Sequence, residues 1–173
     1  DEARKYRNYA RRMKHENLAV NAAAYERLAS ILTDRTKCFI PTSDTGLDEG
    51  SIIKSNSGDK ASLAAYYFSE ILLCYMFGYY HDALSAVERV KGCEDTIIGF
   101  MLAAEYNFYH SLSITAVYTE SPAKKRKMLR KTLKNNQRKM KKWADSCPAN
   151  FLHKYLLVEA EMARISGRKR AAE

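Results

Sequence analysis

Apolar residues recur every three to four positions along most of this chain, and this spacing predicts amphipathic helices rather than strands. The first expected helix covers residues 2–15 and has four residues on one face: Tyr6, Tyr9, Ala10 and Met13. Asn17 is expected to cap a second helix over residues 18–33. The inward face of that helix is expected to carry Leu18, Ala22, Tyr25, Leu28, Ala29 and Leu32. A short turn at His15-Glu16 would make the two helices an antiparallel hairpin.

The helical spacing fails after residue 33, where glycine, proline, serine, threonine and aspartate become frequent. We expect a flexible connector over residues 34–58, with a turn of helix at Leu47–Lys54. A strongly apolar helix should then start at Ser57 or Asp59 and end at Phe77-Gly78. Its apolar residues cover much of its circumference, which predicts the central helix: Ala61, Leu63, Ala64, Tyr67, Phe68, Ile71, Leu72, Tyr75 and Met76.

Glycines separate the next two expected helices. Gly78 precedes a helix over residues 79–91, which Gly92 ends, with Ala83, Leu84, Val87 and Val90 inward. A longer helix is expected over residues 94–118. One side of it carries Ile98, Met101, Leu102, Glu105, Tyr106, Tyr109, Leu112, Ser113 and Ala116.

Two prolines mark the ends of the last helices. Ser121-Pro122 predicts an N-cap followed by proline at the first position of a helix over residues 122–146. Cys147-Pro148 should stop that helix, because proline lacks an N–H and disfavours the α conformation of the residue before it. Asn150 is expected to cap a final helix that ends at Ser166-Gly167. At this joint Cys147 should be largely buried, and Trp143 should pack against the helix that begins near Phe151.

One spacing occurs twice, from Gly78 to Ala83 and from Gly167 to Ala172. A glycine that reverses the chain, followed by a small residue that lets the next helix approach, is typical of tetratricopeptide-type hairpins. Residues 168–173 should open another helix, which suggests a piece of a longer protein. The predicted fold is all-α, a single domain over residues 1–173. It is expected to be a tetratricopeptide-like right-handed array of seven or eight helices in antiparallel hairpins.

Composition agrees with a water-soluble helical protein, since the chain has 46% hydrophobic residues and only 7 Gly and 3 Pro among 173 residues. No apolar run is long enough to span a bilayer, and the N-terminal residues do not form a signal peptide, so we expect a cytoplasmic location. The four cysteines form no C-x-x-C motif and are expected to be reduced thiols: Cys38, Cys74, Cys93 and Cys147.

The helix expected over residues 122–146 carries most of the excess charge. Residues 124–142 contain 11 Lys and Arg and no acid, whereas the whole chain has a formal net charge of +9. Leu129, Leu133, Asn136, Met140 and Trp143 recur at helical spacing and predict a buried stripe opposite the charges. The candidate interaction face comprises Lys124, Lys127, Arg130, Lys131, Lys134, Arg138 and Lys141.

Three interpretations of this basic face remain open. It is a solvated outer surface, a docking surface for an acidic protein segment, or a surface for nucleic acid or an anionic membrane. Single-strand binders interleave aromatic residues with basic ones, whereas this stretch offers only Trp143, on the buried stripe. A protein partner is therefore favoured over nucleic acid, and no membrane insertion is expected.

No catalytic or cofactor motif occurs in the chain. The single histidines His15, His81, His110 and His153 lie at expected turns or within helices, and none is followed by the His-x-x-Lys-Gly pattern of phosphotransfer bundles. We therefore expect a chain that is not itself an enzyme and needs no cofactor or metal.

Residues 60–173 contain a specific series of motifs. These are Glu105-Tyr106-Asn107-Phe108-Tyr109-His110-Ser111-Leu112, Asn135-Asn136-Gln137, Trp143-Ala144-Asp145, Cys147-Pro148, Asn150-Phe151-x-His153-Lys154-Tyr155 and Glu159-Ala160-Glu161. The series resembles the helical region of very large bacterial signalling kinases. In those proteins this region lies between a predicted signal-transduction ATPase and a GAF domain with a histidine kinase. Residues 1–58 resemble the preceding hairpin more loosely.

The resemblance implies a tetratricopeptide-like relay segment without catalysis of its own, whose partners are the neighbouring kinase, ATPase or GAF domains. It implies no binding site, because the shared residues are typical of packing and capping. The alternative function is a stand-alone regulator that binds an acidic partner or nucleic acid through residues 124–142.

Overall fold

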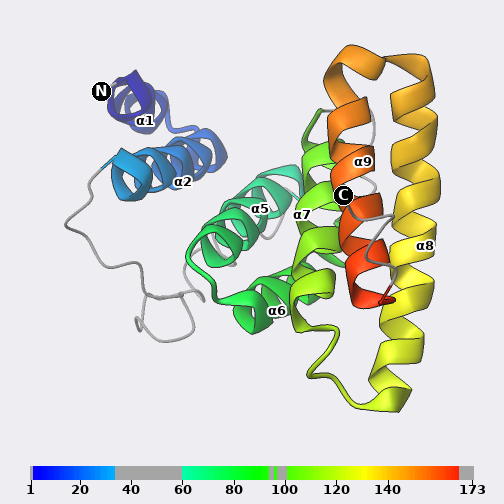
Figure 1. Cartoon of the computed structure of the whole chain (residues 1–173). Coiled ribbons are helices and arrows are strands. Elements are labelled where there is room, and N and C mark those ends of the chain that lie inside the picture. Colours follow the sequence, from blue (N-terminus) through cyan, green and yellow to red (C-terminus); the bar gives the residue numbers. More distant parts are fainter. Residues whose placement is uncertain (1, 34–59, 94–95, 97–100, 168–173) are drawn as a thin grey trace. The chain divides into compact units, whose positions relative to one another are not determined.

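A computed structural model describes residues 2–33, 60–93, 96 and 101–167, and this part of the chain forms seven α-helices without a strand (Figure 1). The prediction of an all-α protein is therefore confirmed. Helix contacts divide the chain into two compact units, residues 1–99 and 100–173, and each is described by itself. The single domain expected from the sequence stays a prediction. The connector over 34–58, the start of the central helix at Ser57 or Asp59, and Ala172 lie outside the described residues.

Unit 1 begins with α1 (Glu2–Arg12) and α2 (Glu16–Thr33), which lie against each other. Lys14 adopts a left-handed φ of 58° in the connecting turn, and the His15 N–H donates to the Ala10 carbonyl at 2.9 Å. Because α2 begins at Glu16, Asn17 lies inside the helix, and its prediction as the N-cap is wrong.

The inward face predicted for α2 is largely wrong. Leu18, Tyr25, Ala29 and Leu32 are exposed, while Ala22 and Leu28 are half-buried. The helix instead packs through Leu28 and Ile31 against a core cluster formed by Leu73, Cys74 and Ala83. Arg27 lies on the same side of α2. A charged residue on a packing face interrupts the apolar spacing, so the spacing does not identify that face.

The rest of unit 1 comprises α5 (Lys60–Met76) and α6 (Tyr80–Val90). Ile71 and Leu73 of α5 are fully buried, as expected of a core helix, although Ala61 and Met76 near its ends are exposed against the prediction. Arg27 on α2 pairs with the buried carboxylate of Glu70 on α5, at 3.0 Å between Nη1 and Oε1. Breaking such a pair would leave a charge in the interior, so the contact constrains how α2 lies on α5.

The predicted glycine turns are confirmed. Gly78 and Gly92 follow α5 and α6 with φ values of 84° and 89°, a conformation that costs glycine little because it has no Cβ. Along α6, Ala83, Val87 and Val90 are buried and Leu84 is half-buried, as predicted.

Unit 2 comprises α7 (Met101–Val117), α8 (Ala123–Ser146) and α9 (Pro148–Ile165), and each of the three packs against the other two (Figure 1). Leu112 and Ser113 of α7 are buried as predicted, whereas Met101 is exposed. The expected start of α7 at Glu94, with Ile98, lies outside the described residues. Gly167 follows α9 with a φ of 73°, which confirms the predicted C-terminal turn.

The two predicted N-caps of unit 2 are wrong, although α8 ends before Cys147-Pro148 as expected. The Ser121 hydroxyl donates to the Val117 carbonyl at 2.9 Å, so it satisfies the end of α7 and leaves Pro122 at the N-cap of α8. In α9, Pro148 takes the first helical position and Cys147 the N-cap. A proline there sacrifices no hydrogen bond, so the helix starts early and Asn150 falls inside it.

Ala83 offers a test of the core of unit 1, because it is fully buried against the α5 side of the cluster. Ala83→Leu should lower the free energy of unfolding by about 1–3 kcal/mol, since the added carbons have no room. Urea denaturation measures the loss. Ser85→Leu, at an exposed position of the same helix, is the matched control. Equal effects of the two variants would contradict close packing at Ala83.

Cysteine reactivity offers a second test. Burial, aided by the nearby Glu70 carboxylate, raises the pKa of Cys74 to about 12, so its reactive thiolate is scarce even at pH about 9. Cys147 is only half-buried, which corrects the prediction for it. Maleimide labelling under native conditions, followed by peptide mass spectrometry, should modify Cys147 well before Cys74. Labelling of Cys74 at the rate of a free peptide thiol would contradict its burial.

Candidate docking surface

The apolar stripe of α8 packs into unit 2 much as the sequence predicts. Leu129, Leu133 and Met140 are buried, the last two completely. Trp143 is half-buried, and its ring centroid lies 6.3 Å from that of Phe151 on α9, which confirms their predicted packing. The stripe therefore determines which side of α8 faces the interior.

Two buried amides on α8 add directional contacts to this packing. The Asn136 side-chain nitrogen donates to Ser111 Oγ at 3.1 Å, and the main-chain carbonyl of Asn136 accepts from Asn107 Nδ2 at 3.1 Å, which joins α8 to α7. Gln137 Nε2 donates to the Tyr155 carbonyl and to Glu159 Oε1, at 3.1 and 2.8 Å, which joins α8 to α9. Sequence periodicity included Asn136 in the buried stripe but missed Gln137.

The charged side of α8 is exposed along its whole length. All eleven Lys and Arg of residues 124–142 are exposed, as predicted. Within the part of the chain that the structure describes, only Lys141 among them forms an ion pair, with Asp145 at 3.1 Å. Unit 2 therefore presents a concentration of positive charge with little internal neutralisation.

Most of the candidate interaction face borders two hollows on unit 2. A hollow of about 490 Å³ is lined by Tyr118, Ala123, Arg126, Lys127, Arg130, Lys131 and Lys134. A second one of about 240 Å³ is lined by Lys134, Gln137, Arg138, Lys141, Tyr155, Glu159 and Met162. Lys134 belongs to both, so they adjoin. Six of the seven predicted residues line these hollows, whereas Lys124 does not.

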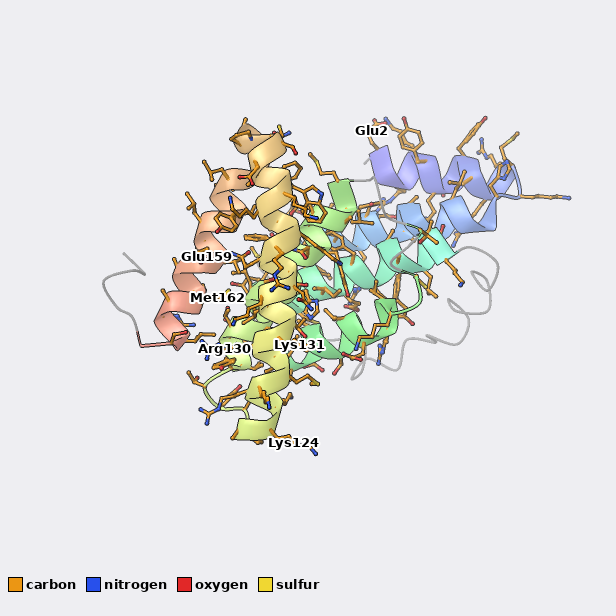
Figure 2. The ribbon with its side chains drawn as sticks, turned by 90° about the vertical axis from the view of Figure 1, so that its right-hand side faces the viewer. Glu2, Lys124, Arg130, Lys131, Glu159 and Met162 are labelled. Atoms are coloured by element: carbon orange, nitrogen blue, oxygen red, sulfur yellow. The ribbon has the colours of Figure 1, made fainter. Side chains whose placement is uncertain are left out.

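Residues from the neighbouring helices complete the walls of the hollows. Figure 2 shows Glu159 and Met162 on α9 beside α8, which carries the labelled Lys124, Arg130 and Lys131. Tyr118 comes from the end of α7 and Tyr155 from α9. Sequence reasoning missed these tyrosines because no spacing within residues 124–142 refers to other helices. The hollows thus combine seven cations with apolar surface and one carboxylate, from Glu159.

Like charges lie one helical turn apart along α8 and repel each other. Five such pairs are four residues apart: Arg126 and Arg130, Lys127 and Lys131, Arg130 and Lys134, Lys134 and Arg138, Arg138 and Lys142. Each costs an isolated helix about 0.2–0.5 kcal/mol at low salt. An anionic ligand would relieve this repulsion as well as form contacts of its own, so the face favours negative partners.

The described residues contain no group of three or more His, Cys, Asp and Glu that could hold a metal ion. Among the histidines, His15, His81 and His153 are exposed, and the ring of the half-buried His110 contacts that of Tyr106 in a tilted arrangement, with centroids 5.7 Å apart. No helix in the described ranges is long and apolar enough to cross a membrane. The basic face of α8 is therefore the strongest candidate site in unit 2.

Comparison with known proteins yields no relative, since no protein-family model, no curated protein and no solved structure matches the chain. The resemblance to the helical region of signalling kinases therefore stays a prediction. The case for a function rests on the geometry of the two units.

Neighbouring asparagines allow a test of how α8 is held. Asn136→Ala should cost about 1–3 kcal/mol of unfolding free energy, because it removes a buried hydrogen-bonding side chain between α8 and α7. Asn135→Ala is the matched control, since Asn135 is the adjacent and exposed residue of the same type. Chemical denaturation measures both. Similar losses from the two changes would show that the Asn136 contact adds nothing.

Proposed function

We propose that this chain is a non-catalytic helical scaffold segment of a large cytoplasmic signalling kinase, with a tetratricopeptide-like arrangement of helix pairs. The basic face of α8 docks an acidic protein segment there, from a neighbouring domain or from a partner. The observation that carries this proposal is the lining of two adjoining hollows by seven exposed cations, of which Lys141 alone has an ion-pair partner among the described residues.

The geometry of the hollows suits a chain-like ligand. Ala123 and Lys141 bound the hollows along α8, and the eighteen residue steps between them span about 27 Å at 1.5 Å per residue. An extended peptide of about eight residues has this length. Carboxylates on such a peptide would meet cations along both hollows, while its apolar side chains would contact Tyr118, Tyr155 and Met162.

The motif residues that carry the resemblance to signalling kinases contact one another in unit 2. Lys154 pairs with Glu105, Asn136 with Ser111, and Gln137 with Glu159. Trp143 packs on Phe151. These contacts join α7, α8 and α9, so the motif residues contribute to the packing of unit 2. That role supports a scaffold.

Binding of single-stranded nucleic acid is the second candidate function. Tyr118 and Tyr155 supply aromatic rings beside the cations, and such rings can stack with bases. Glu159, however, places a carboxylate in the second hollow, where it repels phosphates. A peptide that carries hydrogen-bond donors as well as carboxylates tolerates Glu159 better, which favours the protein partner.

Charge reversal tests the docking surface. The test variant reverses four cations that line the hollows: Lys127→Glu, Arg130→Glu, Lys134→Glu and Lys141→Glu. It should weaken binding of a Glu-rich peptide by at least about tenfold, because the attraction becomes repulsion. Binding to the unaltered protein should weaken between low and physiological salt, where exposed charges are screened over about 8–10 Å. Fluorescence anisotropy measures the affinities, and thermal melts check that both proteins fold.

The same helix provides a control with equal charge change. Four of its exposed cations lie outside the hollows and are reversed together: Lys124→Glu, Lys125→Glu, Lys139→Glu and Lys142→Glu. Equal losses in the two variants would show that net charge alone binds the peptide. Binding of an oligothymidylate in preference to the peptide would favour the second candidate function.

The parent protein provides the test of the scaffold assignment. Kinase and GAF sequences on either side of this segment in its reading frame would support the proposal, and their absence would contradict it. In such a parent, the four-cation variant should abolish signalling, measured as autophosphorylation, without lowering the melting temperature of the segment. Normal autophosphorylation with a normal melt would mean that the face is only solvated.

A further inference from the structure

A second surface, on α1 and α2 of unit 1, exposes large apolar side chains. Tyr6 and Tyr9 on α1, and Met13 directly after it, are 67%, 64% and 52% exposed. On α2, Leu18, Tyr25 and Leu32 are 58%, 49% and 46% exposed. We call these six residues the outer face. Concentrations of exposed apolar side chains on a small helix pair usually mark an interaction site.

Helical geometry places the six residues on one side of the pair. We call Tyr6, Tyr9 and Met13 the α1 stripe, and Leu18, Tyr25 and Leu32 the α2 stripe. At about 100° per residue, the α1 stripe lies roughly a quarter turn around the helix from Arg7 and Ala10, which face α2. The α2 stripe lies on the third of that helix which neither α1 nor α5 covers. Arg4, near the start of α1, pairs with Glu26 in the second half of α2, whereas the end of α1 leads directly into the start of α2, so the two helices run in opposite directions. For two right-handed helices in this orientation, both stripes emerge on the same side.

The charges around the outer face are mainly positive. Residues 2–33 contain seven Lys and Arg against three Glu, a formal charge of +4. Glu26 pairs with Arg4 and Arg7, at 3.0 and 2.7 Å, so its negative charge is already neutralised by contacts between α1 and α2. Arg11, Arg12 and Lys14 are exposed and form no ion pair with any described residue. Arg12 and Lys14 flank Met13 in sequence, whereas Arg11 lies on the far side of α1 from Tyr6 and Tyr9. The outer face is therefore bordered by cations at its Met13 end.

We propose that the outer face docks an acidic amphipathic helix of a partner protein. The stripes follow spacings of three, four and seven residues, which is the pattern that a third helix fills when it lies in the groove between two others. Its leucine-type side chains would cover Tyr9, Tyr25 and Leu32. Its flanking Asp and Glu would meet the cations at the end of α1.

The observations disfavour two other occupants. A second copy of the chain would bring together two helix pairs that each have a formal charge of +4 over residues 2–33, and like charges oppose such an association. Single-stranded nucleic acid could stack bases on Tyr6, Tyr9 and Tyr25, but it would leave the exposed aliphatic side chains of Leu18 and Leu32 without a partner. An acidic amphipathic helix uses both the aliphatic and the charged parts.

Designed peptides test this proposal. The probe is a peptide of about eighteen residues, matched to the length of α2, with Leu on one helical face and Glu beside it. Two further peptides keep the length: one has the same composition in scrambled order, and one carries Lys in place of Glu. Titration calorimetry should show binding of the ordered acidic peptide at least about tenfold tighter than either of the others.

Variants localise the binding. Tyr9→Ser with Tyr25→Ser should weaken it by about tenfold or more, since both side chains lie at the middle of the outer face. Met76→Ser with Leu156→Ser, at similarly exposed positions elsewhere, should leave it unchanged. These changes leave α8 intact, so the basic docking surface can be tested separately with the Glu-rich peptide.

Several outcomes would overturn the proposal. Binding that survives Tyr9→Ser with Tyr25→Ser would show that the peptide does not bind at the outer face. Equal binding of the Lys peptide would show that the partner need not be acidic. A dimer in sedimentation velocity that this variant abolishes would assign the outer face to a second copy. Binding of oligothymidylate that the variant abolishes would assign it to nucleic acid.

Discussion

Burial of one stripe of α8 is the constraint on which the organisation of unit 2 depends. Leu133 and Met140 are fully buried, and Asn136 and Gln137 hydrogen-bond to opposite neighbours, α7 and α9. Apolar contact alone would permit the helix some rotation, but two buried amides with fixed partners do not. The side of α8 without packing contacts must then present every charge to solvent. The basic face of α8 is thus a consequence of how the helix packs.

Unit 1 shows a related combination of apolar packing and one directional contact. Leu28 and Ile31 of α2 reach the core cluster, and Arg27 beside them pairs with the buried Glu70. This arrangement uses one side of α2 and leaves Leu18, Tyr25 and Leu32 exposed. The two candidate surfaces therefore differ in kind. That of α8 is dominated by charge and should respond strongly to salt, whereas the outer face is mainly apolar and should respond less.

Particular elements show how far sequence reasoning reached. The turns at Gly78 and Gly167 were predictable because a positive φ is cheap for glycine alone. The caps were not, since a polar residue near a helix end has several partners within reach. Ser121 serves the end of α7 instead of the start of α8, and Pro148 starts α9 before Asn150 can cap it. Such choices depend on local competition that residue types do not reveal.

The sequence by itself determined the all-helical class, most helix ranges, and the opposition between the apolar stripe and the charges of α8, because these follow from local spacing at 3.6 residues per turn. It also identified six of the seven cations that line the hollows. Only the tertiary structure decided which face of α2 is buried, and it alone brought Tyr118, Tyr155 and Glu159 beside those cations. The reason is physical: periodicity reports the faces of one helix, whereas a packing partner and a hollow are properties of several helices together.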